Sequence, residues 1–249
     1  MKTLFPNLKK CLNLSLILLI SSTLAQADIN ASKLKQKLIH DIEKSKSNSF
    51  SLLLKRWSKK YGGQSVSPLV EIVREKKLDE KKRYIALMGA TKIGGKKVAP
   101  LIVPFLKDSS WMIRSGSLRA LAILKNPSTA RSVLPLLEDR SLVVRTEAVH
   151  AIESLRPAGA VDALIEAATH KRNFHGGKSQ WLPKKALAAL VQIGINKNKA
   201  PKLAPLLNYE KDKDLLQKTI SVLKKITGNN KIKGSLKEQV KQWKTALKS

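Results

Sequence analysis

The chain has 249 residues, a length typical of one or two globular domains or of one elongated repeat array. Its hydrophobic content of 43% is sufficient for a buried core, which excludes a chain that is disordered throughout. The 48 Lys and Arg residues outnumber the 18 Asp and Glu residues, and the formal net charge is +30. Such an excess predicts attraction to anionic partners such as phosphates, carboxylate polymers or anionic lipid headgroups.

The N-terminus has the pattern of a secretory signal peptide. Three lysines precede an apolar run over residues 11–20, and a small-x-small triplet follows at residues 25–27. The run is about ten residues long, whereas a membrane-spanning helix needs roughly 20. We therefore expect residues 1–27 to be a cleaved signal peptide, with an uncleaved anchor as the alternative. The mature protein is then exported to a bacterial periplasm or secreted, and no membrane span remains after cleavage.

The rest of the chain repeats with a period of 31 residues. Two consecutive copies match at six positions: Asp108 with Asp139, Arg114 with Arg145, Leu118 with Val149, Ala120 with Ala151, Leu121 with Ile152, and Leu124 with Leu155. Apolar residues spaced by three and four predict two helices per copy, separated by glycine or proline. A fixed period of this size is typical of a solenoid. We expect about six helical hairpins over residues 48–249, preceded by an N-terminal capping helix over residues 28–47.

Residues 134–139, followed by Val143, Val144 and Arg145, resemble the HEAT repeat, particularly the short bacterial type named after the phycobilisome lyases. The resemblance covers most of residues 48–247 and implies an all-α fold, a right-handed, ARM-like α-solenoid. In that family an Asp and an Arg six residues later form a ladder between neighbouring repeats. The matching residues here are Asp108, Arg114, Asp139 and Arg145. Because the family includes scaffolds, lyases and nucleic-acid binders, the resemblance is specific for the fold and not for the function.

Few residues are arranged for catalysis or metal binding. The four histidines are His40, His150, His170 and His175, and none belongs to a His-x-x-x-His or His-Glu-x-x-His motif, the spacing that places two metal ligands on one helical face. Cys11, the only cysteine, lies in the predicted signal peptide, so the mature chain has no thiolate and no disulfide. The glycine doublets lack a phosphate-binding motif. We therefore expect no cofactor, no metal and no enzymatic activity.

The resemblance nevertheless raises two enzyme classes. Phycobilisome lyases attach bilin pigments in the cytoplasm, which conflicts with export. The HEAT-like alkylpurine DNA glycosylases rely on tryptophans with a nearby catalytic carboxylate, and no acid lies within the turn that follows Trp111 or Trp181. An enzyme of the lyase or glycosylase type is therefore the third choice.

Basic residues gather in one of the two kinds of turn. The turns that follow the first helix of each predicted hairpin contain no Asp or Glu, and in a stacked array they lie along one edge, about 10 Å apart. We call their cations the basic edge: Lys59, Lys60, Lys92, Lys96, Lys97, Lys125, Arg156, Lys197, Lys199, Lys231 and Lys233. The edge is a candidate surface for a linear polyanion. Lysines after a helix also favour the helix dipole, which leaves a purely structural interpretation open.

An insertion interrupts the repeat after residue 169. It combines cations with aromatic residues around Gly176-Gly177, a composition suited to anion contact and stacking on a flexible loop. Its candidate binding residues are His170, Lys171, Arg172, Phe174, His175, Lys178 and Trp181. The alternative is a longer turn whose aromatic residues cover the adjoining core.

The sequence as a whole predicts an exported, non-enzymatic scaffold that binds a protein or an anionic envelope polymer through its basic edge and inner helices. Sequence-independent nucleic-acid binding is the alternative, and strong salt dependence is expected of both. The sequence predicts neither the identity of the ligand nor the oligomeric state.

Overall fold

The computed structural model describes residues 26, 28–45 and 50–248. Apart from residue 26, the predicted signal peptide lies outside these ranges. No helix within them is long and apolar enough to cross a bilayer. The chain divides into two compact units, Met1–Gly95 and Lys96–Ser249, which are described in turn.

The first unit is built around Trp57, which is fully buried. Its indole Nε1 donates a 2.8 Å hydrogen bond to Asp41 on the helix formed by residues 28–44, and the apolar face of that helix buries Leu38 and Ile42. Arg83 is also buried and donates from Nε to the Val73 carbonyl at 2.8 Å. The unit continues with α2 (Phe50–Lys60), η2 (Gly62–Ser65), α3 (Val66–Arg74) and α4 (Glu80–Gly94).

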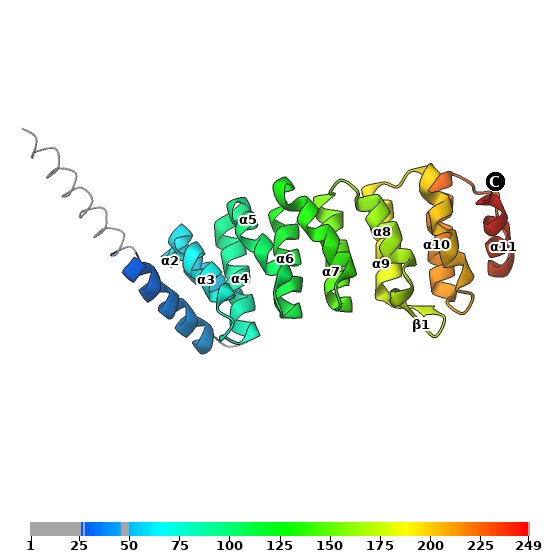
Figure 1. Cartoon of the computed structure of the whole chain (residues 1–249). Coiled ribbons are helices and arrows are strands. Elements are labelled where there is room, and N and C mark those ends of the chain that lie inside the picture. The colour runs from blue at the N-terminus through cyan, green and yellow to red at the C-terminus, as the bar shows by residue number, and fades with distance from the viewer. Residues whose placement is uncertain (1–25, 27, 46–49, 249) are drawn as a thin grey trace, which may run out of the picture. The chain divides into compact units, whose positions relative to one another are not determined.

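The second unit is an α-solenoid, as predicted. Helices α6, α7, α9 and α10 lie side by side in a row (Figure 1). The second elements of the hairpins form the other row, and the apolar core lies between the two rows. In chain order the elements are η3 (Gly95–Val98), α5 (Ala99–Ile102), η4 (Val103–Lys107), α6 (Trp111–Leu124), η5 (Pro127–Glu138), α7 (Leu142–Leu155), α8 (Ala160–Thr169), η6 (Lys171–Asn173), β1 (Phe174–His175), β2 (Lys178–Ser179), α9 (Trp181–Ile193), η7 (Lys197–Asn208), α10 (Lys213–Thr227) and α11 (Leu236–Ala246).

Proline accompanies the 3₁₀ winding of three second elements in the second unit, whereas the helices α3 and α5 have a proline in their first turn and are α-helical. The elements η4, η5 and η7 are 3₁₀ helices, and they contain Pro104, Pro135, and Pro201 with Pro205, respectively. Proline has no N–H and its ring clashes with the carbonyl four residues back, which disfavours the α-helical pattern. The proline-free second helices α8 and α11 are regular α-helices. The apolar spacing predicted α-helices throughout. The structure differs from this prediction at η4, η5 and η7, which are wound more tightly as 3₁₀ helices.

Buried arginines tie consecutive repeats of the second unit together. Arg114 in α6 donates from Nε and Nη2 to the two carboxylate oxygens of Asp139 in the next repeat, at 2.6 and 2.7 Å. Its Nη1 donates to the carbonyls of Asp108 and Ser109, in the turn before its own helix. Asp139 also accepts from the Ser141 amide at 2.8 Å. The pair therefore joins Arg114 to the following repeat, while Asp108 contributes its carbonyl to Arg114.

The charge state of Asp139 follows from these contacts. Burial by itself raises the pKa of Asp139, but the hydrogen bonds from the Arg114 guanidinium and the Ser141 amide outweigh burial, and the pKa is lowered. The hydrogen bond from Arg114 to Asp139 in turn raises the pKa of Arg114. Both groups are therefore charged at neutral pH, in a site that excludes most water.

Replacing Asp139 by alanine leaves the buried Arg114 guanidinium without its counter-ion. We expect Asp139→Ala to lower the free energy of unfolding at pH 7 by about 3–5 kcal/mol, measured by urea denaturation. Because the pKa of Asp139 is lower in the folded chain, the contribution of the carboxylate is complete above the unfolded-state pKa of about 3.9 and is lost as the pH falls through the folded-state pKa. The difference between wild type and variant should therefore shrink in acid.

The matched control is Glu147→Ala. Glu147 of α7 pairs with Arg119 of α6 between the same two repeats, but the Arg119 side chain is 53% exposed and that of Glu147 is 15% exposed. An exposed pair contributes about 1 kcal/mol or less. If Asp139→Ala costs no more than Glu147→Ala, the buried pair does not have the role assigned here.

Candidate functional site

Hydrogen bonds hold the turns of the basic edge next to one another in the second unit. The Asn126 side chain donates from Nδ2 to the Lys96 carbonyl at 3.0 Å, and the Ser154 hydroxyl donates to the Ala122 carbonyl at 2.8 Å. Arg156 donates from Nη2 to the Gln192 carbonyl at 3.1 Å. Each bond joins the turn or helix end of one repeat to that of the next. The cations of these turns are therefore carried by successive repeats in order along one side of the unit.

Two of these cations have a strained backbone. Lys125 (φ 48°, ψ 43°) and Arg156 (φ 48°, ψ 54°) end α6 and α7 in the left-handed conformation. The corresponding residues after α9 and α10 are Gly194 and Gly228, which also have positive φ. Glycine adopts this region freely, whereas other residues pay roughly 1–2 kcal/mol. The helix dipole stabilises a cation at the C-terminal end of a helix by only about 0.3–1 kcal/mol.

The remaining residues of the edge differ in their freedom to bind a ligand. Lys96, Lys97, Lys197, Lys231 and Lys233 are exposed. Lys199 instead pairs with Asp162 of α8, with Nζ 2.7 and 2.9 Å from the two carboxylate oxygens.

Asp162 therefore interrupts the positive charge of the edge. It lies just after the acid-free turn and also accepts from Lys202 at 2.9 Å. Lys199 and then Lys202 lower the pKa of Asp162, which stays ionised. Tallying the turns alone missed this acid in the first turn of α8.

The three predicted residues of the first unit lie at the ends of its helices. Lys59 and Lys60 end α2, Lys92 lies in the last turn of α4, and all three are exposed. The Lys60 ammonium lies 5.3 Å from the centroid of the Tyr61 ring, a distance suited to a cation–π contact. These residues are described within their own unit.

The insertion forms a braced β-hairpin and not a flexible loop. β1 and β2 pair Phe174 with Ser179 and His175 with Lys178, and Gly176 and Gly177 have positive φ, as a tight hairpin turn requires. The Phe174 ring stacks on Tyr209, with centroids 3.8 Å apart.

A second contact fixes the other strand of this hairpin. Asp212 accepts hydrogen bonds from the Ser179 amide at 2.7 Å and from its hydroxyl at 2.5 Å. Burial alone raises the pKa of Asp212, but its hydrogen bonds, led by that from the Ser179 hydroxyl, lower it. Asp212 thus joins the hairpin to the N-terminus of α10, where it also accepts from the Leu215 amide.

The predicted binding residues of the insertion divide into two groups. Phe174 is occupied by Tyr209. The exposed residues are Lys171, Arg172, His175, Lys178 and Trp181, and Trp181 is 64% exposed. Trp111 begins α6 as Trp181 begins α9, and it is 46% exposed. Half of the tryptophans therefore lie at the surface, at the same position of two repeats, whereas Trp57 and Trp243 are buried.

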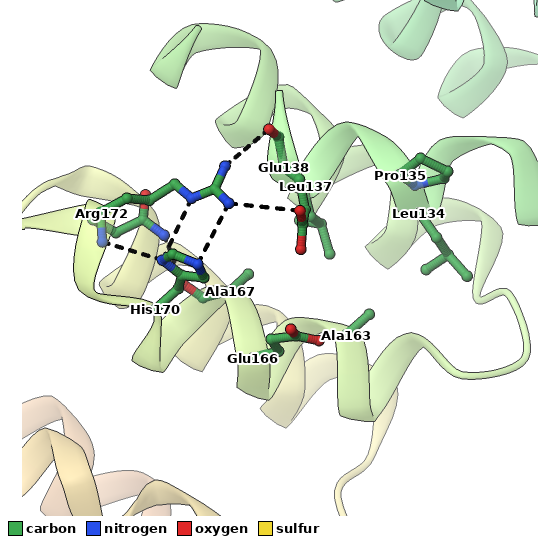
Figure 2. Close-up of a pocket in the computed structure, with 10 residues that line it drawn as sticks. Leu134, Pro135, Leu137, Glu138, Ala163, Glu166, Ala167, His170 and Arg172 are labelled. Carbon is green, nitrogen blue, oxygen red and sulfur yellow. Dashed lines mark hydrogen bonds and ion pairs between the residues drawn. The ribbon is translucent and has the colours of Figure 1, made fainter. Parts of the chain in front are cut away.

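His170 and Arg172 border a cavity of about 240 Å³ between η5 and α8 (Figure 2). Leu134, Leu137 and Ala163 contribute apolar surface to it. The Arg172 guanidinium lies between Glu138 and His170 in Figure 2; it donates to the Glu138 carbonyl at 3.0 Å and lies 3.5 Å from the Glu138 carboxylate. Arg172 is therefore committed to the protein and does not offer a free cation to a ligand.

Asn173 is the structural residue that the sequence analysis missed. It is 1% exposed, accepts from Arg145 Nε at 3.1 Å, and donates from Nδ2 to the Ala167 carbonyl at 2.8 Å. Asn173 thus accepts a hydrogen bond from Arg145 in the way that Asp139 accepts one from Arg114. Arg145 donates hydrogen bonds to the Asn173 amide oxygen and to two main-chain carbonyls. Burial, and then the positive charge of Arg172, lower the pKa of Arg145. The repeat spacing did not predict the role of Asn173, because Asn173 lies 28 residues after Arg145, whereas Asp139 lies 25 residues after Arg114.

No metal centre is present in the described ranges, where no group of three His, Cys, Asp or Glu side chains is placed to hold an ion. The chemistry that the described surface offers is electrostatic and apolar contact: exposed ammonium and guanidinium groups along the basic edge, and two exposed indoles.

Truncating Asn173 leaves two buried groups without a partner, Arg145 Nε and the Ala167 carbonyl. We expect Asn173→Ala to lower the free energy of unfolding by about 2–4 kcal/mol, since each unsatisfied group costs about 1–3 kcal/mol. Lys178→Ala in the hairpin that follows Asn173 serves as the control and should change stability by less than about 0.5 kcal/mol. Equal, small effects of the two substitutions would show that Asn173 does not brace the array.

Comparison with known proteins agrees with the repeat architecture. A model of HEAT repeats matches residues 66–153, about a third of the chain. No curated protein matches the chain. Among solved structures, an engineered protein from a structural genomics consortium is 14% identical, with a TM-score of 0.42 over 87% of this chain and 96% of its own. The match over residues 66–153, together with the helical hairpins, supports a HEAT-repeat protein, a class whose members commonly act in protein interaction.

Proposed function

We propose that the protein is an exported, non-enzymatic scaffold that captures an anionic partner along its basic edge. The partner is an anionic envelope polymer or a protein with an acidic surface. The proposal is supported by exposed cations on successive repeats, by the hydrogen bonds that join their turns, and by the common use of HEAT repeats in protein interaction. Cations about 10 Å apart from repeat to repeat suit a linear ligand better than a compact one.

The strained, left-handed backbone of Lys125 is the observation that supports the proposal most directly. At the same position two other repeats use glycine, which removes the strain, and the helix dipole does not fully repay the cost of a lysine there. Within the described part of the second unit, the Lys125 amine forms no ion pair and no hydrogen bond. An unpaired cation kept in a strained conformation is better explained by an external ligand than by stability.

The experiment exchanges lysine and glycine at this position in both directions. We expect Lys125→Gly to keep or raise the free energy of unfolding, by up to about 1 kcal/mol, and to weaken binding to an immobilised anionic polymer. Gly194→Lys should lower stability by about 1 kcal/mol or more and strengthen the same binding. Thermal unfolding and salt-dependent retention on the polymer measure the two quantities.

The choice of ligand separates the proposal from nucleic-acid binding. DNA and an envelope polysaccharide of equal charge should both lose affinity with salt. The proposal expects the polysaccharide or an acidic protein to be retained in the presence of competing DNA. If DNA removes every envelope ligand, the protein is a nucleic-acid binder. If Lys125→Gly and Gly194→Lys leave retention unchanged, the basic edge serves solubility alone.

Export has its own test. A fusion of residues 1–27 to a reporter that folds only when its disulfides form should be active in the oxidising periplasm. When the full-length chain is expressed, the recovered protein should begin at Asp28. Ile17→Lys interrupts the apolar run and should abolish export. Recovery of the chain with Met1 intact in the cytoplasm would contradict the proposal.

A further inference from the structure

A groove of about 860 Å³ opens in the last helical hairpin of the second unit. It lies between the start of α10 and the outer side of α11, which contact one another at the C-terminal end of the row (Figure 1). α11 is the last helix described, so no further described repeat packs against it. No residue of the basic edge lines the groove, so ligand binding here is independent of the function proposed for that edge.

The floor of the groove is apolar. Leu216 of α10 and Leu236 and Val240 of α11 line it; Leu216 and Val240 are buried and Leu236 is half-buried. A Ser235–Glu238 capping box fixes the start of α11, because the Ser235 amide and hydroxyl donate to Glu238 at 2.7 and 2.8 Å. The side chains of the floor are therefore held in place before any ligand arrives.

Lysines form the rim of the groove. Three of them lie on α11 at spacings of four and three residues, so they share one face of the helix, and a fourth follows the end of the helix. With one lysine from the start of α10, the set is Lys213, Lys237, Lys241, Lys244 and Lys248. Among the described residues, only Lys244 has a carboxylate partner, Glu210, at 3.8 Å. The other acid at the rim, Glu238, is engaged by Ser235.

We propose that this groove binds one anionic phospholipid, with the headgroup phosphate on the lysines and an acyl chain on the apolar floor. Inorganic phosphate would satisfy the cations and leave the accessible part of Leu236 in contact with water, whereas a neutral acyl chain would leave the cations without a counter-ion. A phospholipid satisfies both. The volume lies within the range of roughly 300–1,000 Å³ that is typical of small-molecule sites. Lysines beside an apolar helix face are also the composition that attracts anionic lipid surfaces.

Native mass spectrometry of the full chain tests the proposal with lysophosphatidylglycerol as the probe. We expect one molecule to bind per chain, and neither lysophosphatidylcholine nor inorganic phosphate to displace it. Lys237→Glu with Lys241→Glu should weaken this binding by about tenfold or more. The matched control is Lys96→Glu with Lys97→Glu, which changes the net charge equally on the basic edge and should leave lipid binding within about twofold of wild type.

The apolar floor needs its own variants. Leu236→Asn keeps the charge and should reduce binding of the lysolipid without changing the weak binding of inorganic phosphate. Because this variant also affects packing, Thr245→Trp provides a second test: Thr245 is exposed, lines the groove, and a tryptophan there should obstruct it. The proposal is overturned if both lysine pairs weaken binding equally, if Leu236→Asn and Thr245→Trp have no effect, or if an acidic peptide displaces the lipid at equal concentration.

Discussion

Buried arginines near the start of the first helices constrain how consecutive repeats of the second unit can stack. A guanidinium that is shielded from water needs an acceptor for its N–H groups, since an unmet donor is costly. Arg114 and Arg145 take acceptors from two places: the main-chain carbonyls of the turn before their own helix, and a side chain from the following turn. The hydrogen bonds therefore fix the register of one repeat on the next, which apolar packing alone would leave adjustable.

The same constraint explains the form of the insertion. Extra residues after α8 would move the acceptor away from Arg145, but the short turn of η6 places Asn173 at the required position. The hairpin that follows is attached by Phe174 to Tyr209 and by Ser179 to Asp212. The added residues thus extend the network between repeats, and the exposed remainder consists of Lys171, Arg172, the hairpin tip and the indole of Trp181.

The helical hairpins followed from the sequence because the 31-residue period and the apolar spacing are local signals. The 3₁₀ winding of the second elements was missed, although Pro135, Pro201 and Pro205 indicate it. The tight hairpin was also signalled, by Gly176-Gly177 between short polar and aromatic runs. The roles of Asn173 and Asp162 were not, because each depends on a partner from another repeat, Arg145 and Lys199. Partner choice across repeats is a tertiary property that spacing along the chain does not contain.

The residue with positive φ that ends α6, α7, α9 and α10 gives the array a simple way to change its surface. At this position α6 and α7 carry Lys125 and Arg156, and α9 and α10 carry Gly194 and Gly228, with the same backbone hydrogen bond to the preceding turn in all four helices. Exchange between glycine and a basic residue leaves the topology intact and alters only strain and charge. The charge density of such an array can therefore be changed one repeat at a time, and the strain that each cation adds limits how many of them a marginally stable array can carry.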